Sequence, residues 1–274
     1  NASGESIGLG GGSGDLNLAD AEIALLTDGF SSITIGRSNS TGAIDIDAIT
    51  FTDPVTIRGG AITVTALQAG NNNITLTSTA TIDEDVDDTT VDITTSATLV
   101  MTAAGAIGAT GGSGPLDLAV GTLQAVTNAT GIFLLEGDGL IIGGTGVQTT
   151  GGNAAIEITL TAGNLTLDED ITANGSGTVT LTLSTADTAV VTTNNTDNIA
   201  STSGAITISA DRLTLAVGTI ASTGALILQP NATGETIGVG DGASGGLDLD
   251  VAEIALLTNG FSLITIGKAD SGVV

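Results

Sequence analysis

Short stretches in which aliphatic residues alternate with threonine run through most of the chain. Examples are "AITVTA" (residues 61–66), "NITLTS" (residues 73–78) and "VTLTLS" (residues 179–184). A period of two places successive side chains on opposite faces of a strand, so the pattern predicts half-buried strands with aliphatic side chains inside and threonine outside. The residues that we expect to point inward are Ile62, Val64, Ile74, Leu76, Leu165, Leu167, Val179, Leu181, Ile206 and Ile208.

The composition selects among the folds that such strands can build. Turns rich in glycine and asparagine separate the strands, and no long helical pattern does, which excludes a β/α alternation. The core of a β-sandwich or barrel usually contains aromatic side chains, whereas the 274 residues include four Phe, no Trp and no Tyr, although 41% of the chain is hydrophobic. A β-solenoid has a narrow core that suits aliphatic side chains, and repetition is typical of it. We therefore favour an all-β fold, a parallel β-helix (β-solenoid), over a sandwich or barrel.

One phrase occurs twice and breaks the strand pattern. "AEIALLTDGFSSITIG" (residues 21–36) and "AEIALLTNGFSLITIG" (residues 252–267) differ only at two positions. The spacing of the apolar residues predicts a helix of one or two turns in each copy, near residues 20–27 and 251–258, with Asp20 as a cap of the first. We expect the apolar faces of these helices to pack on the β core; these faces contain Ile23, Leu26 and Phe30 in the first copy and Ile254, Leu257 and Phe261 in the second.

The repetition also predicts a tandem organisation. The opening "NASGESIGLG" matches "NATGETIGVG", which begins at Asn231. We interpret residues 1–230 as one tandem solenoid unit and residues 231–274 as the start of the next, homologous unit, in one continuous solenoid without a true boundary. We expect the chain to be part of a longer protein that contains more of these units.

The densest acidic cluster is "DEDVDD", at residues 83–88. Clustered carboxylates can bind Ca²⁺, which prefers oxygen ligands. The candidate metal ligands are Asp83, Glu84, Asp85, Asp87 and Asp88, with Asp92 close by. The alternative is a solvated turn that keeps the surface soluble, because neither an EF-hand spacing nor a glycine-rich calcium nonapeptide is present. Apart from this possible Ca²⁺, we expect no cofactor.

Charge and residue types exclude several classes of function. The chain has 30 acidic and 4 basic residues and a net charge of −26. Nucleic-acid binding needs Lys and Arg, so it is excluded as a function. No stretch approaches the length of about 18 apolar residues that a membrane span needs. The chain has no His and no Cys, which removes the usual general bases and thiol nucleophiles, and we expect no enzyme.

Two longer stretches carry a resemblance to a known family. "AGNLTLDEDITANGSGTVTLT" (residues 162–182) and "GALILQPNATGETIGVG" (residues 224–240) resemble the filamentous haemagglutinin-like repeats of giant bacterial surface proteins. The phrase at residues 23–37 also resembles these repeats. The resemblance implies a right-handed parallel β-helix, export to the cell surface, and a role in adhesion or filament formation.

These observations together predict a mechanical function. We expect a structural stalk or filament-forming segment of a large bacterial extracellular adhesin, with no catalytic activity. Its partners would be other copies of itself or neighbouring repeats in a fibre, and a host or neighbour-cell surface. The alternative is a ligand-binding β-solenoid module at the cell surface, whose ligand is Ca²⁺ or a surface glycan.

Overall fold

The computed structural model shows an all-β chain that coils as a parallel β-solenoid, as the sequence predicts. It divides into two compact units, Asn1–Leu135 and Glu136–Val274, and each is described here by itself. The extent of the tandem unit over residues 1–230 stays a prediction. The structure describes residues 4–110, 114–128, 130–186, 188–192 and 197–268.

The first unit contains three ladders of parallel strands. The first ladder comprises β1 (Ile7–Gly10), β4 (Ile44–Ile46), β7 (Ile62–Val64) and β10 (Ile82–Glu84), with β2 (Leu16–Ala19) beside β1. The second comprises β5 (Ile49–Thr50), β8 (Leu67–Gln68) and the beginnings of β11 (Ile93–Ala103) and β12 (Leu116–Thr127). The third comprises β3 (Ile33–Gly36), β6 (Val55–Gly59), β9 (Ile74–Ser78) and the ends of β11 and β12. Strand β13 (Ile132–Glu136) begins with a bridge from Ile132 to Ile107.

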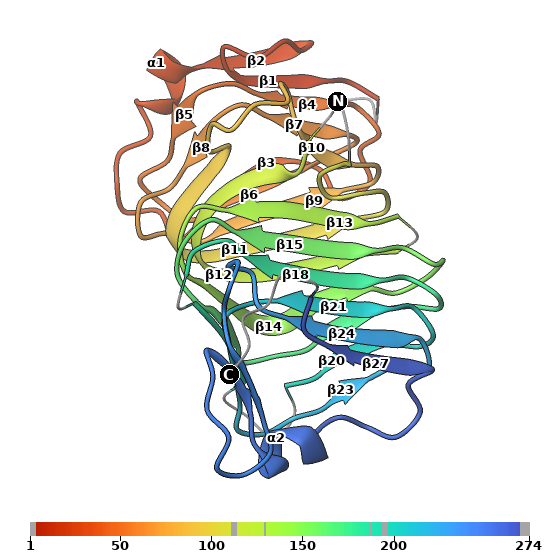
Figure 1. The fold of residues 1–274 in the computed structure, drawn as a ribbon. Coiled ribbons are helices and arrows are strands. Elements are labelled where there is room, and N and C mark those ends of the chain that lie inside the picture. Colours follow the sequence, from red (N-terminus) through yellow and green to blue (C-terminus); the bar gives the residue numbers. More distant parts are fainter. Residues whose placement is uncertain (1–3, 111–113, 129, 187, 193–196, 269–274) are drawn as a thin grey trace. The chain divides into compact units, whose positions relative to one another are not determined.

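The second unit is built in the same way. Its first ladder comprises β15 (Ile156–Leu160), β18 (Val179–Leu183), β21 (Ile206–Ser209), β24 (Ala225–Gln229) and β27 (Leu263–Ile266), which appear as successive layers in Figure 1. The second comprises the beginning of β14 (Leu140–Thr149), β16 (Leu165–Leu167), β19 (Ala189–Thr192) and β22 (Arg212–Leu215). The third comprises the end of β14, β17 (Ile171–Ala173), β20 (Ile199–Ser201) and β23 (Ile220–Ala221). Strands β25 (Ile237–Val239) and β26 (Leu247–Leu249) form a separate two-stranded sheet.

The number of residues in a coil varies, but the inward residues of successive coils still pair with one another. Most residues of a strand pair with residues 18 to 28 positions further along the chain, as in Ile44↔Ile62 and Ile171↔Ile199. The two coils that contain the repeated phrase are longer, at 37 and 38 residues (Ile7↔Ile44 and Leu226↔Ile264). The extra residues are therefore accommodated between ladders rather than within them.

The predicted register of the core is confirmed. All ten residues that the alternation places inside are at most 1% exposed. The threonines between them, such as Thr75 and Thr180, are half-buried on the outer face. Aliphatic side chains of successive coils stack on one another and, together with buried Phe51, exclude water from the interior.

Serine hydroxyls and glycines close the corner between the third and first ladders of the second unit. Buried Ser201 donates to the carbonyl of Gly177 over 2.7 Å and accepts the amide N–H of Gly204 over 2.9 Å. One coil later, Ser222 donates to the carbonyl of Gly204 over 2.6 Å and accepts the N–H of Gly224 over 2.9 Å. These hydroxyls satisfy backbone groups that the turn leaves without a ladder partner.

Both copies of the repeated phrase form a helix, but the helices are short. Helix α1 spans Asp20–Ile23 and α2 spans Val251–Ala255. The prediction that Asp20 caps α1 is wrong, because Ala19 occupies the cap position and Asp20 is the first helical residue. In α2 the cap is Asp250, whose carboxylate accepts the N–H of Glu253 over 2.7 Å. No helix among the described residues has the length and apolar character needed to cross a membrane.

The helices cover the core less completely than the sequence predicts. Ile23 is buried, but Phe30 is 50% exposed, so the prediction that this ring packs on the core is wrong. An open hollow of about 340 Å³ lies between α1 and the coil that contains Phe51, lined in part by Ile23 and Leu26. In the second copy Ile254, Leu257 and Phe261 are all half-buried. A helix of one turn cannot present three apolar residues to one surface, because the chain leaves the helix before the third.

Replacing Leu181 with Ala should lower the free energy of unfolding by about 2–5 kcal/mol, because the side chain is fully buried between coils and its loss leaves a cavity. Urea denaturation followed by circular dichroism would measure this, since the chain has no Trp or Tyr. Thr180→Ala on the outer face is the matched control and should change stability by less than about 1 kcal/mol. A larger effect at Thr180 than at Leu181 would contradict the register.

Replacing Gly204 with Ala should destabilise the corner by about 1–3 kcal/mol, because the new Cβ would lie 2.0 Å from the carbonyl oxygen of Gly177. Gly139→Ala is the control, since a Cβ there meets nothing closer than 3.5 Å. Thermal melts of the two variants would distinguish them. Equal melting temperatures would show that the corner adapts to a methyl group.

Candidate functional site

Glu84 is a carboxylate at an inward position of the first unit. In β10 the side chains of Ile82 and Glu84 face the core, and Asp83 between them faces outward. Glu84 pairs with Val64, which in turn pairs with Ile46. Two preceding coils therefore place an aliphatic side chain where this coil places a carboxylate, and Glu84 is only 6% exposed.

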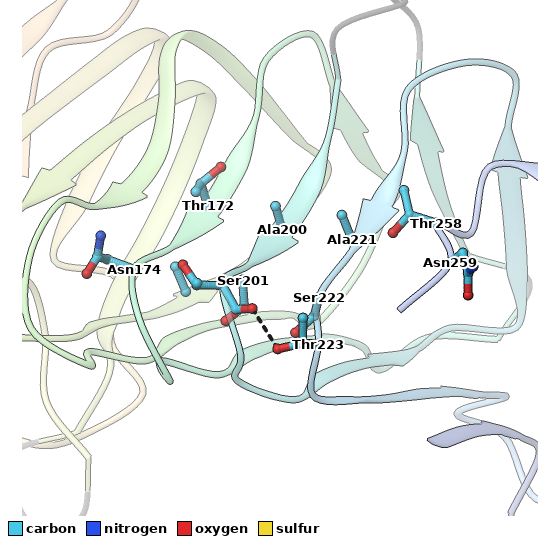
Figure 2. A pocket seen from close by; sticks show the side chains of 11 residues that line it. Thr172, Asn174, Ala200, Ser201, Ala221, Ser222, Thr223, Thr258 and Asn259 are labelled. Carbon is cyan, nitrogen blue, oxygen red and sulfur yellow. Dashed lines mark hydrogen bonds between the residues drawn. The ribbon is translucent and has the colours of Figure 1, made fainter. Parts of the chain in front are cut away.

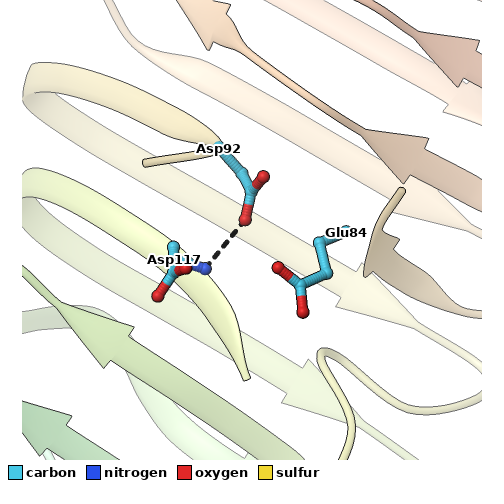
Figure 3. A group of neighbouring side chains, drawn as sticks. All are labelled: Glu84, Asp92 and Asp117. Carbon is cyan, nitrogen blue, oxygen red and sulfur yellow. Dashed lines mark hydrogen bonds between the residues drawn. The ribbon is translucent and has the colours of Figure 1, made fainter. Parts of the chain in front are cut away.

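Asp92 and Asp117 are stacked on each other in successive coils. Asp92 directly precedes β11, and Asp117 is the second residue of β12. The N–H of Asp92 donates to the carbonyl oxygen of Asp117, and the N–H of Asp117 donates to Oδ2 of Asp92, both over 2.9 Å. Both side chains are buried. Figure 3 shows these two aspartates near Glu84.

The three carboxylates form a compact, under-satisfied group, which we call the carboxylate trio (Glu84, Asp92 and Asp117). One oxygen from each can be chosen so that all lie within 4.8 Å of one another. Both oxygens of Glu84 and both of Asp117 are buried and have no hydrogen-bond partner among the residues that the structure describes. Burying an ionised carboxylate without a partner is strongly unfavourable, so the trio must acquire protons or a positive charge.

Burial raises the pKa of all three carboxyls. Loss of hydration is the largest cause in each case, and it raises the pKa of Glu84 to about 7, of Asp92 to about 8 and of Asp117 to about 6. Neighbouring carboxylates add to the rise, chiefly Asp117 for Glu84 and Asp88 for Asp117. The N–H that Asp117 donates to Asp92 acts in the opposite direction.

The other predicted metal ligands lie outside the trio. Asp83 is half-buried on the outer face, and burial raises its pKa. Asp85, Asp87 and Asp88 are exposed, and Asp88 accepts the N–H of Thr90 over 2.5 Å. Of the five predicted ligands, only Glu84 belongs to the trio, together with Asp92, which the sequence places close to them.

Asp87 lies at the edge of the trio, next to Gly114. A Cβ on Gly114 would lie 2.2 Å from Oε1 of Glu84 and 2.5 Å from Oδ1 of Asp87. The two carboxylates therefore approach the same point, which a glycine leaves open. The sequence does not single out Asp117, because the period of two places Leu116 and Leu118 inward and the aspartate between them outward, as it does for Asp45 between Ile44 and Ile46.

The trio can share protons or hold a hard cation, but its geometry does not suit hydrolysis of a polymer. All three side chains are less than 10% exposed, so a sugar or peptide cannot reach them.

The second unit has an open hollow of about 390 Å³ on its surface (Figure 2). Thr172, Ala200 and Ala221 lie in register along it, and Thr258 and Asn259 of the repeated phrase lie at one end. Thr223 donates to the carbonyl oxygen of Thr202 over 3.0 Å. Its lining consists of small and uncharged side chains, so it provides shape but no acid, base or charged ligand.

Asp170 has a structural role. Oδ1 of Asp170 accepts the backbone and side-chain N–H groups of Asn198, over 2.8 and 3.0 Å. Oδ1 of Asn198 in turn accepts from the N–H and hydroxyl of Thr219, over 3.0 and 2.7 Å. These bonds connect three successive coils of the second unit.

Comparison with known proteins found no matching family model, no similar curated protein and no similar solved structure.

The stability of the chelator-treated protein should decrease as the pH rises from about 4 to about 8. The folded trio has pKa values above those of the unfolded chain, so the folded state binds more protons in this window and loses that advantage as they dissociate. Urea denaturation at several pH values would measure the slope. The double variant Glu84→Gln, Asp117→Asn should have a shallower slope; an unchanged slope would show that the trio does not titrate in this range.

Proposed function

We propose that this chain is a structural, non-catalytic β-solenoid segment of a large bacterial extracellular adhesin, which acts as a stalk or as part of a filament. The observation that carries the proposal is the pairing of the repeated phrase. In the first unit, β3 of the phrase pairs with β6, which follows it in the chain. In the second unit, β27 of the same phrase pairs with β24, which precedes it.

The two pairings complement each other, since the phrase is nearly identical in both copies. The first copy shows that the phrase can pair with the strand of the coil that follows it, and the second copy shows that it can pair with the strand of the coil that precedes it. A coil that pairs with a neighbouring coil on each side can join successive tandem units of a longer protein by an uninterrupted ladder of hydrogen bonds. A tandem array of such units would extend without a hinge.

The surface and the core both support a mechanical role. Aliphatic columns give each coil the same packing on both sides, so coils can be added to the solenoid by repeating the same kind of contact. A net charge of −26 opposes lateral aggregation of exposed strands. The resemblance of residues 162–182 and 224–240 to filamentous haemagglutinin-like repeats supports a cell-surface location, where the partners would be neighbouring repeats, other copies and the surface of another cell.

A fusion of two copies of this chain tests the proposal. Fusing Gly267 of one copy to Arg37 of a second copy retains the phrase once at the junction. We expect its maximum dimension, measured by small-angle X-ray scattering and electron microscopy, to increase by about 4.8 Å for every added coil.

The control for this fusion carries a flexible Gly/Ser linker between two complete chains. It should give particles with variable angles between two segments. If the direct fusion bends at the junction as freely as the linked control, the phrase is not a continuous joint and the stalk proposal fails.

A further inference from the structure

We propose that Glu84, Asp92 and Asp117 bind one divalent cation, Ca²⁺, and that the ion cross-links two successive coils of the first unit. Glu84 and Asp92 flank one corner of a coil, and Asp117 lies at the same corner of the next coil. The four unpartnered oxygens of Glu84 and Asp117 are buried and lie at this corner. A cation there would satisfy oxygens that the described protein groups leave without a partner.

The ligand chemistry selects the class of metal. The trio consists of carboxylate oxygens, and the chain has no His or Cys. Hard cations such as Ca²⁺ and Mg²⁺ prefer such a set, whereas zinc and copper prefer nitrogen and sulfur.

Flexibility of coordination favours Ca²⁺ over Mg²⁺. One oxygen from each residue of the trio lies within 4.8 Å of the others, which is close enough for all three to contact one cation. Mg²⁺ demands nearly ideal octahedral geometry at short distances. Ca²⁺ tolerates irregular coordination, as expected for ligands held by three different backbone segments.

Two further residues shape the site. Oδ1 of Asp87 and Oε1 of Glu84 approach the open point beside Gly114, so Asp87 can supply a fourth carboxylate from the exposed rim. A side chain at residue 114 would occupy this space. The site therefore differs from the surface loop predicted from the sequence, because its principal ligands are buried and come from successive coils.

The test is a calcium titration of the full chain after removal of metal with a chelator, at about pH 8, where more of the trio is ionised. We expect isothermal titration calorimetry to show one site with a Kd on the order of 10⁻⁴ M. The melting temperature should rise by about 5 °C in about 10 mM CaCl₂. MgCl₂ should give a smaller rise. NaCl of equal ionic strength is included because any salt screens a chain of this charge.

Matched variants locate the effect. Glu84→Gln with Asp117→Asn should abolish the binding heat and the calcium-specific rise in melting temperature. Asp28→Asn with Asp85→Asn removes the same number of charges from exposed positions and should retain both; the second copy of the phrase already has Asn at the position of Asp28. Gly114→Ala should weaken binding at least tenfold, since its Cβ would crowd Glu84.

Two results would overturn the proposal. One is a wild-type protein that shows no binding heat and no greater rise in melting temperature in CaCl₂ than in NaCl; the trio would then be a proton-sharing cluster. The other is loss of calcium binding in the exposed control variant but not in the trio variant. A stoichiometry of one ion per wild-type chain, together with at least tenfold weaker binding in Gly114→Ala, supports the proposal even if the trio variant does not fold.

Discussion

In-register stacking of coils is the constraint on which the rest of this structure depends. Hydrogen-bonded parallel strands lie about 4.8 Å apart, so each inward side chain contacts its equivalents in the neighbouring coils. Ile44, Ile62 and Ile82 form one such column. Aliphatic columns pack well without directional bonds, whereas the turns between them need residues that bring backbones close together. The buried hydroxyl of Ser222 meets this need, because it accepts the N–H of Gly224 and donates to the carbonyl oxygen of Gly204.

In-register stacking also brings the carboxylates of the trio together. Stacking repeats a charge at the corner when two coils both place an aspartate there, as Asp92 and Asp117 do. Like charges held together in a dry interior repel each other and raise the pKa of each group. The polar stack of Asp170, Asn198 and Thr219 shows the contrasting solution, in which donors and acceptors alternate between coils. The trio has no such alternation in its side chains, and a bound cation would turn the repulsion into a cross-link.

The repeated phrase shows how the fold accepts additional residues. Its coils are 37 and 38 residues long, compared with 18 to 28 elsewhere, and each carries a short helix before the chain returns to a ladder. The carboxylate of Glu253 anchors the second helix. Its Oε2 accepts the N–H of Asp250 and its Oε1 accepts the N–H of Leu215, both over 3.1 Å. The carboxylate that caps the helix thus also connects it to a preceding coil.

The sequence by itself determined the features that depend on neighbouring residues in the chain. A period of two depends only on the pleat of a strand, so Leu181 and Ile206 were correctly predicted to point inward, and the absence of Trp and Tyr correctly indicated a narrow aliphatic core. The two short helices were also predicted, because their apolar spacing is local, but both end earlier than predicted and the predicted cap at Asp20 was wrong.

Only the tertiary structure decided which distant residues meet. Asp92 and Asp117 are 25 residues apart, and they stack because that coil has this length, while other coils are as short as 18 residues. No local pattern encodes the length of a coil, since turns absorb extra residues without changing the alternation within strands. The assembly of the trio follows from this cause: the turns set the coil length, and the coil length determines which side chains share a corner.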